Sequence, residues 1–140
     1  HVTEGHLIKE ELALAGYSLA IGPSFGHADK PELIHKTFCT PGILAKAGCK
    51  VAIITDSPVI EEQYLPVCAW MAVKNGMDEA DALRAITIRA AEHVGVADWI
   101  GSIGVGKDAD FVLTDKSIFD AEYEVIYTII DGKIVGGKGL

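Results

Sequence analysis

The sequence predicts an α/β fold in which two short parallel strands alternate with helices and a small antiparallel β unit follows. Three observations predict it. Between residues 7 and 95, apolar residues recur at helical spacing in several segments. Two strongly apolar runs, YSLAI at 17–21 and VAIIT at 51–55, are separated by a helical segment, as in parallel strands joined by crossovers. From residue 101 onward, the pattern becomes that of an antiparallel sheet.

The first elements follow from local signals. A helix is expected over residues 7–15, where apolar positions share one face and Gly16 can end it. The strand at 17–21 ends at a Gly-Pro pair, and residues 22–32 (GPSFGHADKPE) have loop chemistry throughout. A long loop inside a compact domain is more often functional than not. Thr40 is expected to cap a second helix, with proline in its first turn.

The central elements are more apolar. The run at 51–55 has the continuous pattern of a strand that is covered on both faces. The helix expected over residues 64–76 is apolar almost all round, so we expect it to be enclosed. One further helix is expected to begin after Asp78, its capping residue, and to continue to Gly95.

The C-terminal segment reads as a separate β unit. Residues 109–114 alternate in polarity, and residues 123–130 are rich in β-branched and aromatic side chains. Asp131-Gly132 between two such runs is the strongest hairpin signal in the sequence. We therefore expect a small antiparallel unit after the α/β unit.

Composition limits the classes of partner and compartment. The formal net charge is -8, and no basic stripe is available to neutralise phosphates, which argues against nucleic acid and anionic membranes as partners. No apolar run approaches the roughly 18 residues that a membrane span needs, and the first residues are unlike a signal peptide. Three widely spaced cysteines fit reduced thiols. These features favour a cytoplasmic protein.

Asp56 is the main candidate for chemistry. It follows the apolar run at 51–55, at the carboxyl end of a strand, where parallel α/β folds gather their ligands. Asp-Ser-Pro is also good turn material, so a turn residue is the alternative. A divalent metal beside the carboxylate would offset the cost of burying it. Zinc accepts histidine nitrogen and carboxylate oxygen, and a catalytic zinc site leaves one position open for water.

The histidines supply the other candidates. His1 precedes a helix, as a residue at the carboxyl end of a preceding strand would, and is the natural companion of Asp56; a tag remnant or a cut site is the alternative. His27 and Lys30 lie in the long loop and could bind a substrate carboxylate, although a mobile polar loop is the more frequent outcome. His6 is expected to be a solvated surface residue rather than a ligand, and His35 and His93 are expected to be structural or exposed.

Five segments carry a resemblance to a known family. HVTEGHLI, GPSFGHADKPEL, TPGILAKAGCKVAIITDSPV, DALRAITIRAAEHVGV and GSIGVGKDADFVLTD resemble, in unbroken order, the final third of the metal-dependent amidohydrolases, nearest to the imidazolonepropionase-like branch. The resemblance implies the C-terminal portion of a (β/α)8 TIM barrel in residues 1–95, and strands of a small composite β-sandwich domain in residues 96–140. Because such a barrel needs about 250 residues, these residues cannot close one.

The resemblance also implies roles for two residues. Asp56 matches the aspartate after the eighth barrel strand, and His1 matches the histidine after the sixth. Both would hold Zn2+ or another divalent metal, completed by ligands upstream of His1, because the family's HxH pair and fifth-strand histidine are absent from this sequence. Asp56 would take a proton from the attacking water and later pass it to the leaving nitrogen. His1 would either hold a second metal or polarise the scissile carbonyl.

Two functional hypotheses remain open. In the first, the parent protein is an enzyme that hydrolyses a carbon-nitrogen bond, in an amide or cyclic amide of a small molecule or in a dipeptide, and the 140-residue chain alone is inactive. In the second, the chain is a non-catalytic structural fragment that self-associates and covers its sheet edges with another copy. The expected partners are a small-molecule substrate, the N-terminal part of the same protein and further copies in a homo-oligomer.

Overall fold

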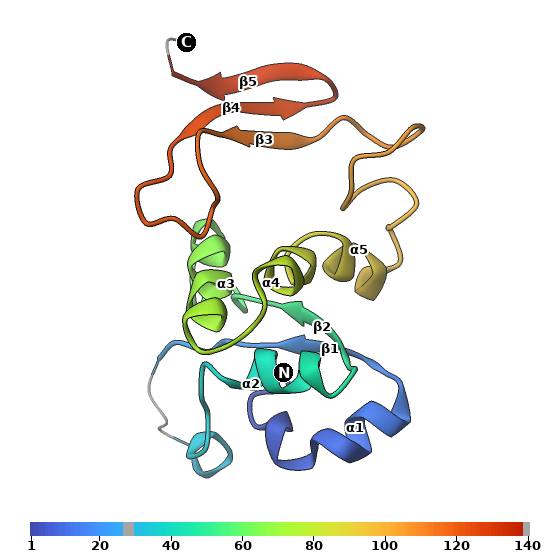
Figure 1. Cartoon of the computed structure of the whole chain (residues 1–140), viewed down its shortest axis with the longest axis vertical. Coiled ribbons are helices and arrows are strands. Elements are labelled where there is room, and N and C mark those ends of the chain that lie inside the picture. The colour runs from blue at the N-terminus through green and yellow to red at the C-terminus, as the bar shows by residue number, and fades with distance from the viewer. Residues whose placement is uncertain (27–29, 139–140) are drawn as a thin grey trace.

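Two sheets and several helices make up the computed structural model, which describes residues 1–26 and 30–138. The helices are α1 (Lys9–Ala15), α2 (Thr40–Lys46), α3 (Leu65–Lys74), α4 (Glu79–Ala85) and α5 (Ile88–Val94), with 3₁₀ helices at Gly5–Ile8, Pro31–Leu33 and Glu62–Tyr64. The strands are β1 (Ser18–Ile21), β2 (Lys50–Ile53), β3 (Phe111–Thr114), β4 (Val125–Ile130) and β5 (Lys133–Gly137). The helices α3, α4 and α5 lie between the β1–β2 pair and the three-stranded sheet (Figure 1).

The β1–β2 pair is parallel, as the sequence predicts. Its register runs from Ser18 opposite Lys50 to Ile21 opposite Ile53, and the connection between the strands contains α2. Parallel strands need such a crossover because the chain must return to the starting end of the sheet before the second strand begins, which a tight turn cannot achieve. On the other edge of β1, the Val2 N–H donates to the Ala20 carbonyl over 3.0 Å. β1 therefore lies between the N-terminal residues and β2.

The main core is built around β2. Its residues Val51, Ala52 and Ile53 are all buried, which agrees with the predicted strand covered on both faces. On β1 only alternate side chains, Leu19 and Ile21, are buried. The same apolar cluster includes side chains from α2, α3 and α4, among them Leu44, Cys68, Ala69, Ala72, Ala82 and Ala85.

Two predicted helices differ from expectation. The helix α3 is not enclosed: Cys68, Ala69 and Ala72 are buried, but Val67 is 42% exposed, because only one side of α3 packs against the core. The single helix predicted over residues 78–95 is divided into α4 and α5. The break falls at Thr87, whose hydroxyl donates to the Leu83 carbonyl over 2.7 Å and offers the backbone an alternative to the continuous helical ladder.

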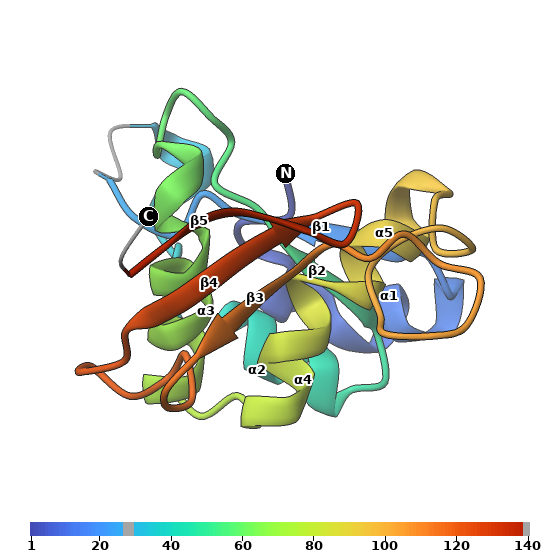
Figure 2. The ribbon, with the colours of Figure 1, turned by 90° about the horizontal axis from the view of Figure 1, so that it is seen from above.

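The three-stranded sheet has the antiparallel order β3-β4-β5. The hairpin predicted at Asp131-Gly132 joins β4 to β5, with both residues at positive φ (50° and 71°), as the favoured two-residue turns require. Viewed from above, this sheet overlies the helices (Figure 2). Many of its apolar side chains are exposed by 41–57%: Phe111, Val112, Leu113, Val125, Ile130, Ile134 and Val135. In residues 1–26 and 30–138, no helix has the length and apolar character to cross a membrane.

Candidate functional site

Asp56 stands where the chain leaves β2. The Ile54 N–H donates to the Ile21 carbonyl over 3.0 Å, so the parallel pairing continues to the last residues before Asp56. Asp56 itself has a positive φ of 56°, and the Val59 N–H donates to its carbonyl over 2.9 Å to close a turn. Aspartate is among the few residues that tolerate this left-handed conformation. The turn interpretation from the sequence is therefore correct for the backbone of Asp56 and leaves its carboxylate available.

The carboxylate of Asp56 faces His1. The distance from His1 Nε2 to Asp56 Oδ1 is 2.8 Å, which is a charge-assisted hydrogen bond when Nε2 carries a proton. The two side chains are 53% and 29% exposed, respectively. The carboxylate of Asp56, which was expected to lie in the interior, is thus only half-buried. His1 and Asp56, which were paired from the sequence, respectively precede and follow segments that bond to the two edges of β1, and their side chains meet at its carboxyl end.

Gly22 shapes the exit of the loop from β1. Its φ is +146°, and a Cβ built there would lie 2.2 Å from the carbonyl oxygen of Ile54. No side chain fits at that distance, so glycine is required for this close approach of the loop to the end of β2. The loop therefore starts in direct contact with the backbone two residues before Asp56.

Two anchors hold the same loop further along, and neither was predicted. The His35 N–H donates to Glu4 Oε1 over 2.7 Å. Lys36 Nζ donates to the carbonyls of Phe25 and Gly26 over 3.0 and 3.2 Å. Each contact joins residues far apart in the sequence, so no local pattern could indicate it. The first contact ties the connection between β1 and α2 to the segment that follows His1, and the second ties the two ends of that connection to each other.

The predicted substrate-binding residues have different outcomes. Lys30 is exposed and precedes the 3₁₀ helix Pro31–Leu33, and within the described ranges no hydrogen bond or ion pair joins it to His1 or Asp56. His27 lies outside the described residues. Their role in binding a substrate stays a prediction.

His6 was expected to be solvated, and this is wrong. It is half-buried, and its Nδ1 lies 2.8 Å from the Thr40 hydroxyl, which is also 3.3 Å from the Thr3 carbonyl. Thr40 is 1% exposed, and its prediction as the helix cap is wrong: Thr40 is the first residue of α2, and the N-cap is Cys39, which makes no side-chain capping hydrogen bond. The contact between His6 and Thr40 connects the start of α2 to the segment between His1 and α1.

The donors in this region fit part of a metal site. Histidine nitrogen and carboxylate oxygen are both ligand types that zinc accepts, and Nε2 and Oδ1 of the pair converge. Among residues 1–26 and 30–138, however, no group of three or more His, Cys, Asp or Glu side chains could surround an ion. His1 and Asp56 would therefore supply two positions, and further ligands would have to come from elsewhere.

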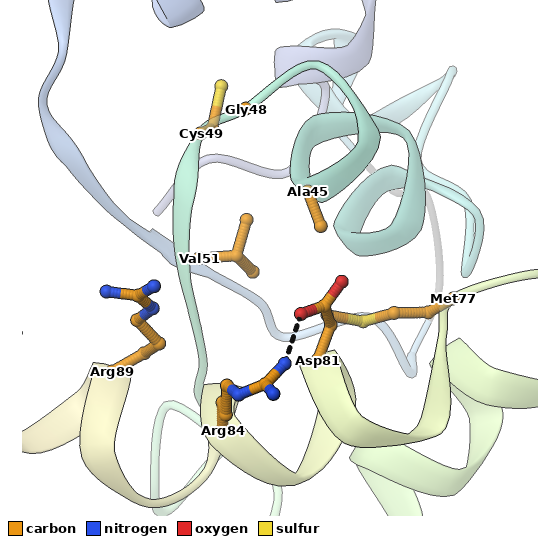
Figure 3. A pocket seen from close by; sticks show the side chains of 8 residues that line it. All are labelled: Ala45, Gly48, Cys49, Val51, Met77, Asp81, Arg84 and Arg89. Atoms are coloured by element: carbon orange, nitrogen blue, oxygen red, sulfur yellow. Dashed lines mark hydrogen bonds and ion pairs between the residues drawn. The ribbon is translucent and has the colours of Figure 1, made fainter.

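A separate hollow of about 200 Å3 lies at the opposite end of β2 (Figure 3). Gly48 and Cys49, just before the strand, line it together with Val51 and side chains of α4 and α5. Its arginines are already paired, Arg84 with Asp81 over 2.9 Å and Arg89 with Glu92 over 2.7 Å. Because ligands of parallel α/β sheets bind at the carboxyl ends of the strands, we do not place the chemistry in this hollow.

The fold and the site together define a class: an α/β protein with a histidine and an aspartate meeting at the carboxyl end of a parallel sheet. Comparison with known proteins is consistent with this. Residues 4–135 match the Amidohydrolase family, and the chain belongs to that family. The resemblance inferred from the sequence is thereby confirmed.

Individual relatives are similar over part of their length. An adenine deaminase of Methanothermobacter thermautotrophicus is 36% identical over 98 residues, which are 69% of this chain and 17% of that protein. An imidazolonepropionase of Geobacillus sp. is 43% identical over 75 residues, which are 49% of this chain and 17% of that protein. This chain thus spans less than a fifth of the length of either relative.

Solved structures agree with the fold. An amidohydrolase from Thermotoga maritima MSB8 superposes with a TM-score of 0.92 at 36% identity, over 99% of this chain and 36% of that one. An adenosine deaminase from Xanthomonas campestris, solved with bound zinc, superposes with a TM-score of 0.63 at 27% identity, over 96% of this chain and 35% of that one. The α/β architecture is therefore that of amidohydrolases of the TIM-barrel superfamily.

Proposed function

We propose that the protein to which this chain belongs hydrolyses a carbon-nitrogen bond in a small molecule, with Asp56 moving the proton. The observation that carries the proposal is the 2.8 Å contact between His1 Nε2 and Asp56 Oδ1 at the carboxyl end of the parallel pair. Family membership supports the same reaction class. Fold alone would not, because one barrel fold hosts many chemistries.

In the proposed reaction, His1 and Asp56 have different roles. The half-exposed carboxylate of Asp56 accepts a proton from an attacking water and returns it to the departing nitrogen, which makes the amine a better leaving group. His1 orients that carboxylate through Nε2 and can polarise the scissile carbonyl. A divalent metal, for which zinc in the related adenosine deaminase is the precedent, would supply Lewis-acid activation of the carbonyl and the water. Asp56 would be one of its ligands, and His1 would be either a second ligand or the group that polarises the carbonyl, since Nε2 cannot do both at once.

For the substrate, we propose a nitrogen heterocycle or another cyclic amide rather than a dipeptide. Several relatives above 25% identity have names that refer to adenine, adenosine or imidazolonepropionate, all of which contain nitrogen rings. In such rings a C–N bond can be hydrolysed within the ring or at an attached amino group. The loop fixed by Glu4 and Lys36 starts beside Asp56 and is the segment best placed to select among such rings.

The decisive test is Asp56→Asn in the whole protein, assayed for ammonia release or ring opening on a panel of nitrogen heterocycles. Because a general acid–base typically contributes about 10²- to 10⁴-fold, kcat should fall by that order while the circular dichroism spectrum stays unchanged. Asp98→Asn is the matched control, since Asp98 is exposed and lies in a turn after α5. Retention of most activity by Asp56→Asn would contradict the proposal.

A second proposal concerns how the sheet of β3, β4 and β5 is completed. Apolar side chains of this sheet are exposed, and the chain spans only 17% of the related adenine deaminase. Both observations support the proposal that another part of the same polypeptide covers the sheet. In this proposal, residues 1–95 belong to a barrel and residues 96–140 to a composite β-sandwich domain. The chain alone would instead cover these surfaces with further copies.

A further inference from the structure

An apolar hollow lies between α3 and the segment that leads to β4. Its volume is about 250 Å3, and its lining includes Pro66, Val67 and Ile118. It exists because the outer side of α3 is not enclosed and residues 118–123 pass beside it. Three further lining residues, Trp70, Tyr123 and Asp120, give this apolar surface a specific electrostatic character.

The two aromatic rings favour a positive charge. Aromatic faces carry partial negative charge and attract ammonium groups, most strongly for tryptophan. Trp70 already shows this property, because Lys74 Nζ lies 5.5 Å from its ring centroid. Lys74 is not among the residues that line the hollow.

Asp120 adds a full negative charge at the same place. Its Oδ1 accepts a hydrogen bond from the Glu122 N–H over 2.8 Å, which fixes the orientation of the carboxylate. In the described part of the chain, no lysine or arginine pairs with it. An oriented carboxylate beside two aromatic rings and an apolar wall is complementary to a cation that carries apolar groups.

We propose that this hollow binds a small organic cation, a quaternary or substituted ammonium with an apolar body. An anion would be repelled by the exposed carboxylate of Asp120, and a neutral apolar molecule would gain no attraction from it. The small volume limits the ligand to a few carbon atoms around the nitrogen. The proposal concerns a surface of α3 and not the His1–Asp56 pair, so it stands or falls independently of the hydrolase proposal.

The test uses choline as the probe. In the 140-residue chain, which contains two tryptophans, Trp99→Phe leaves Trp70 as the only one, so its fluorescence reports directly on the hollow. Choline should produce a saturable change, together with saturation transfer from the protein to its methyl protons in NMR. The neutral isostere 3,3-dimethyl-1-butanol has the same shape without the charge and should bind about tenfold more weakly.

Asp120→Asn isolates the charge. Asparagine keeps the oxygen that accepts from Glu122, so the segment should retain its conformation, while the choline affinity should fall about tenfold toward that of the alcohol. Asp98→Asn, which removes an exposed acid outside the hollow, should leave the choline affinity unchanged. Equal binding of choline and the alcohol, an unaffected Asp120→Asn variant, or no saturable response in either measurement would each overturn the proposal.

Discussion

At the scale of single residues, Thr40 connects segments that are distant in the sequence. Its side chain is buried, and its hydroxyl has His6 Nδ1 and the Thr3 carbonyl as neighbours. A half-buried imidazole nitrogen that loses its partner is costly, since water cannot fully replace it. Thr40 therefore stabilises the segment that carries His1 as well as the start of α2.

Thr40→Val should reduce the free energy of unfolding by about 1–3 kcal/mol, because it keeps the shape of the side chain and removes the hydroxyl. Urea unfolding followed by circular dichroism measures the change. Thr40→Ser, which keeps the hydroxyl, should lose less. The interpretation fails if the serine and valine variants are equally destabilised.

Cys68 offers a pH-dependent prediction. Burial on α3 raises the pKa of its thiol above the ordinary value of 9.0. The folded protein therefore binds this proton more tightly than the unfolded chain, so the stabilisation is complete below about pH 9 and is lost as the pH rises through the folded-state pKa. Urea unfolding at about pH 7.5 and about pH 9.5 should show a loss of stability that is smaller in Cys68→Ala. Cys39→Ala, which removes a half-buried thiol, should keep the loss seen in the unsubstituted chain.

At the scale of elements, local chemistry decides where α4 begins. The Asp78 carboxylate accepts from the N–H groups of Ala80 and Asp81 over 2.9 and 3.1 Å, as the sequence predicted for a capping residue. These two donors would otherwise have no partner within the helix. The helix that packs on β2 thus depends on a side chain just before its first residue.

Asp78→Ala should lower the free energy of unfolding by about 1 kcal/mol, whereas Asp78→Ser should be close to the unsubstituted protein because serine also caps well. Thermal unfolding followed by circular dichroism distinguishes the two. A serine variant as unstable as the alanine variant would show that capping is not the cause.

The elements also show which features a sequence can predict. Gly16, Asp78 and Asp131-Gly132 were correctly assigned as helix ends and a turn because their conformations depend on residues within one turn. The division of the last helix at Thr87 and the open side of α3 were missed. The open side of α3 depends on what packs against the helix, and the division at Thr87 accompanies a side-chain hydrogen bond to Leu83; the periodicity of apolar residues specifies neither.

The same limit applies to the candidate site. The position of Asp56 follows from the apolar run before it, and its meeting with His1 follows from the order of the parallel segments. The anchors from Glu4 to His35 and from Lys36 to the loop backbone could not be predicted, because they join residues far apart in the sequence. They became visible only in the folded arrangement.

At the scale of the whole molecule, the sheet of β3, β4 and β5 carries many exposed apolar side chains. Its outer strands are β3 and β5, and both carry exposed apolar side chains. Edge strands of this kind pair readily with other chains. The 140-residue chain alone should therefore self-associate, in agreement with the second proposal above.

Ile134→Lys should weaken that association, because it places a charge on the edge strand β5 where Ile134 is 53% exposed. Sedimentation velocity over a concentration series measures the effect. Leu14→Lys is the matched control, since Leu14 is 88% exposed on α1, away from the sheet. A monomeric chain at all concentrations, or equal behaviour of the two variants, would exclude association through this sheet.

The position of β1 between the two halves of the His1–Asp56 pair has an evolutionary consequence. The carbonyls of Ala20 and Ile21 hold the backbone near His1 on one edge and near Asp56 on the other. The spacing of His1 and Asp56 is therefore set by the strand, and neither residue belongs to the connection between β1 and α2. Related proteins can therefore differ in that connection and bind other molecules while the spacing of His1 and Asp56 stays the same.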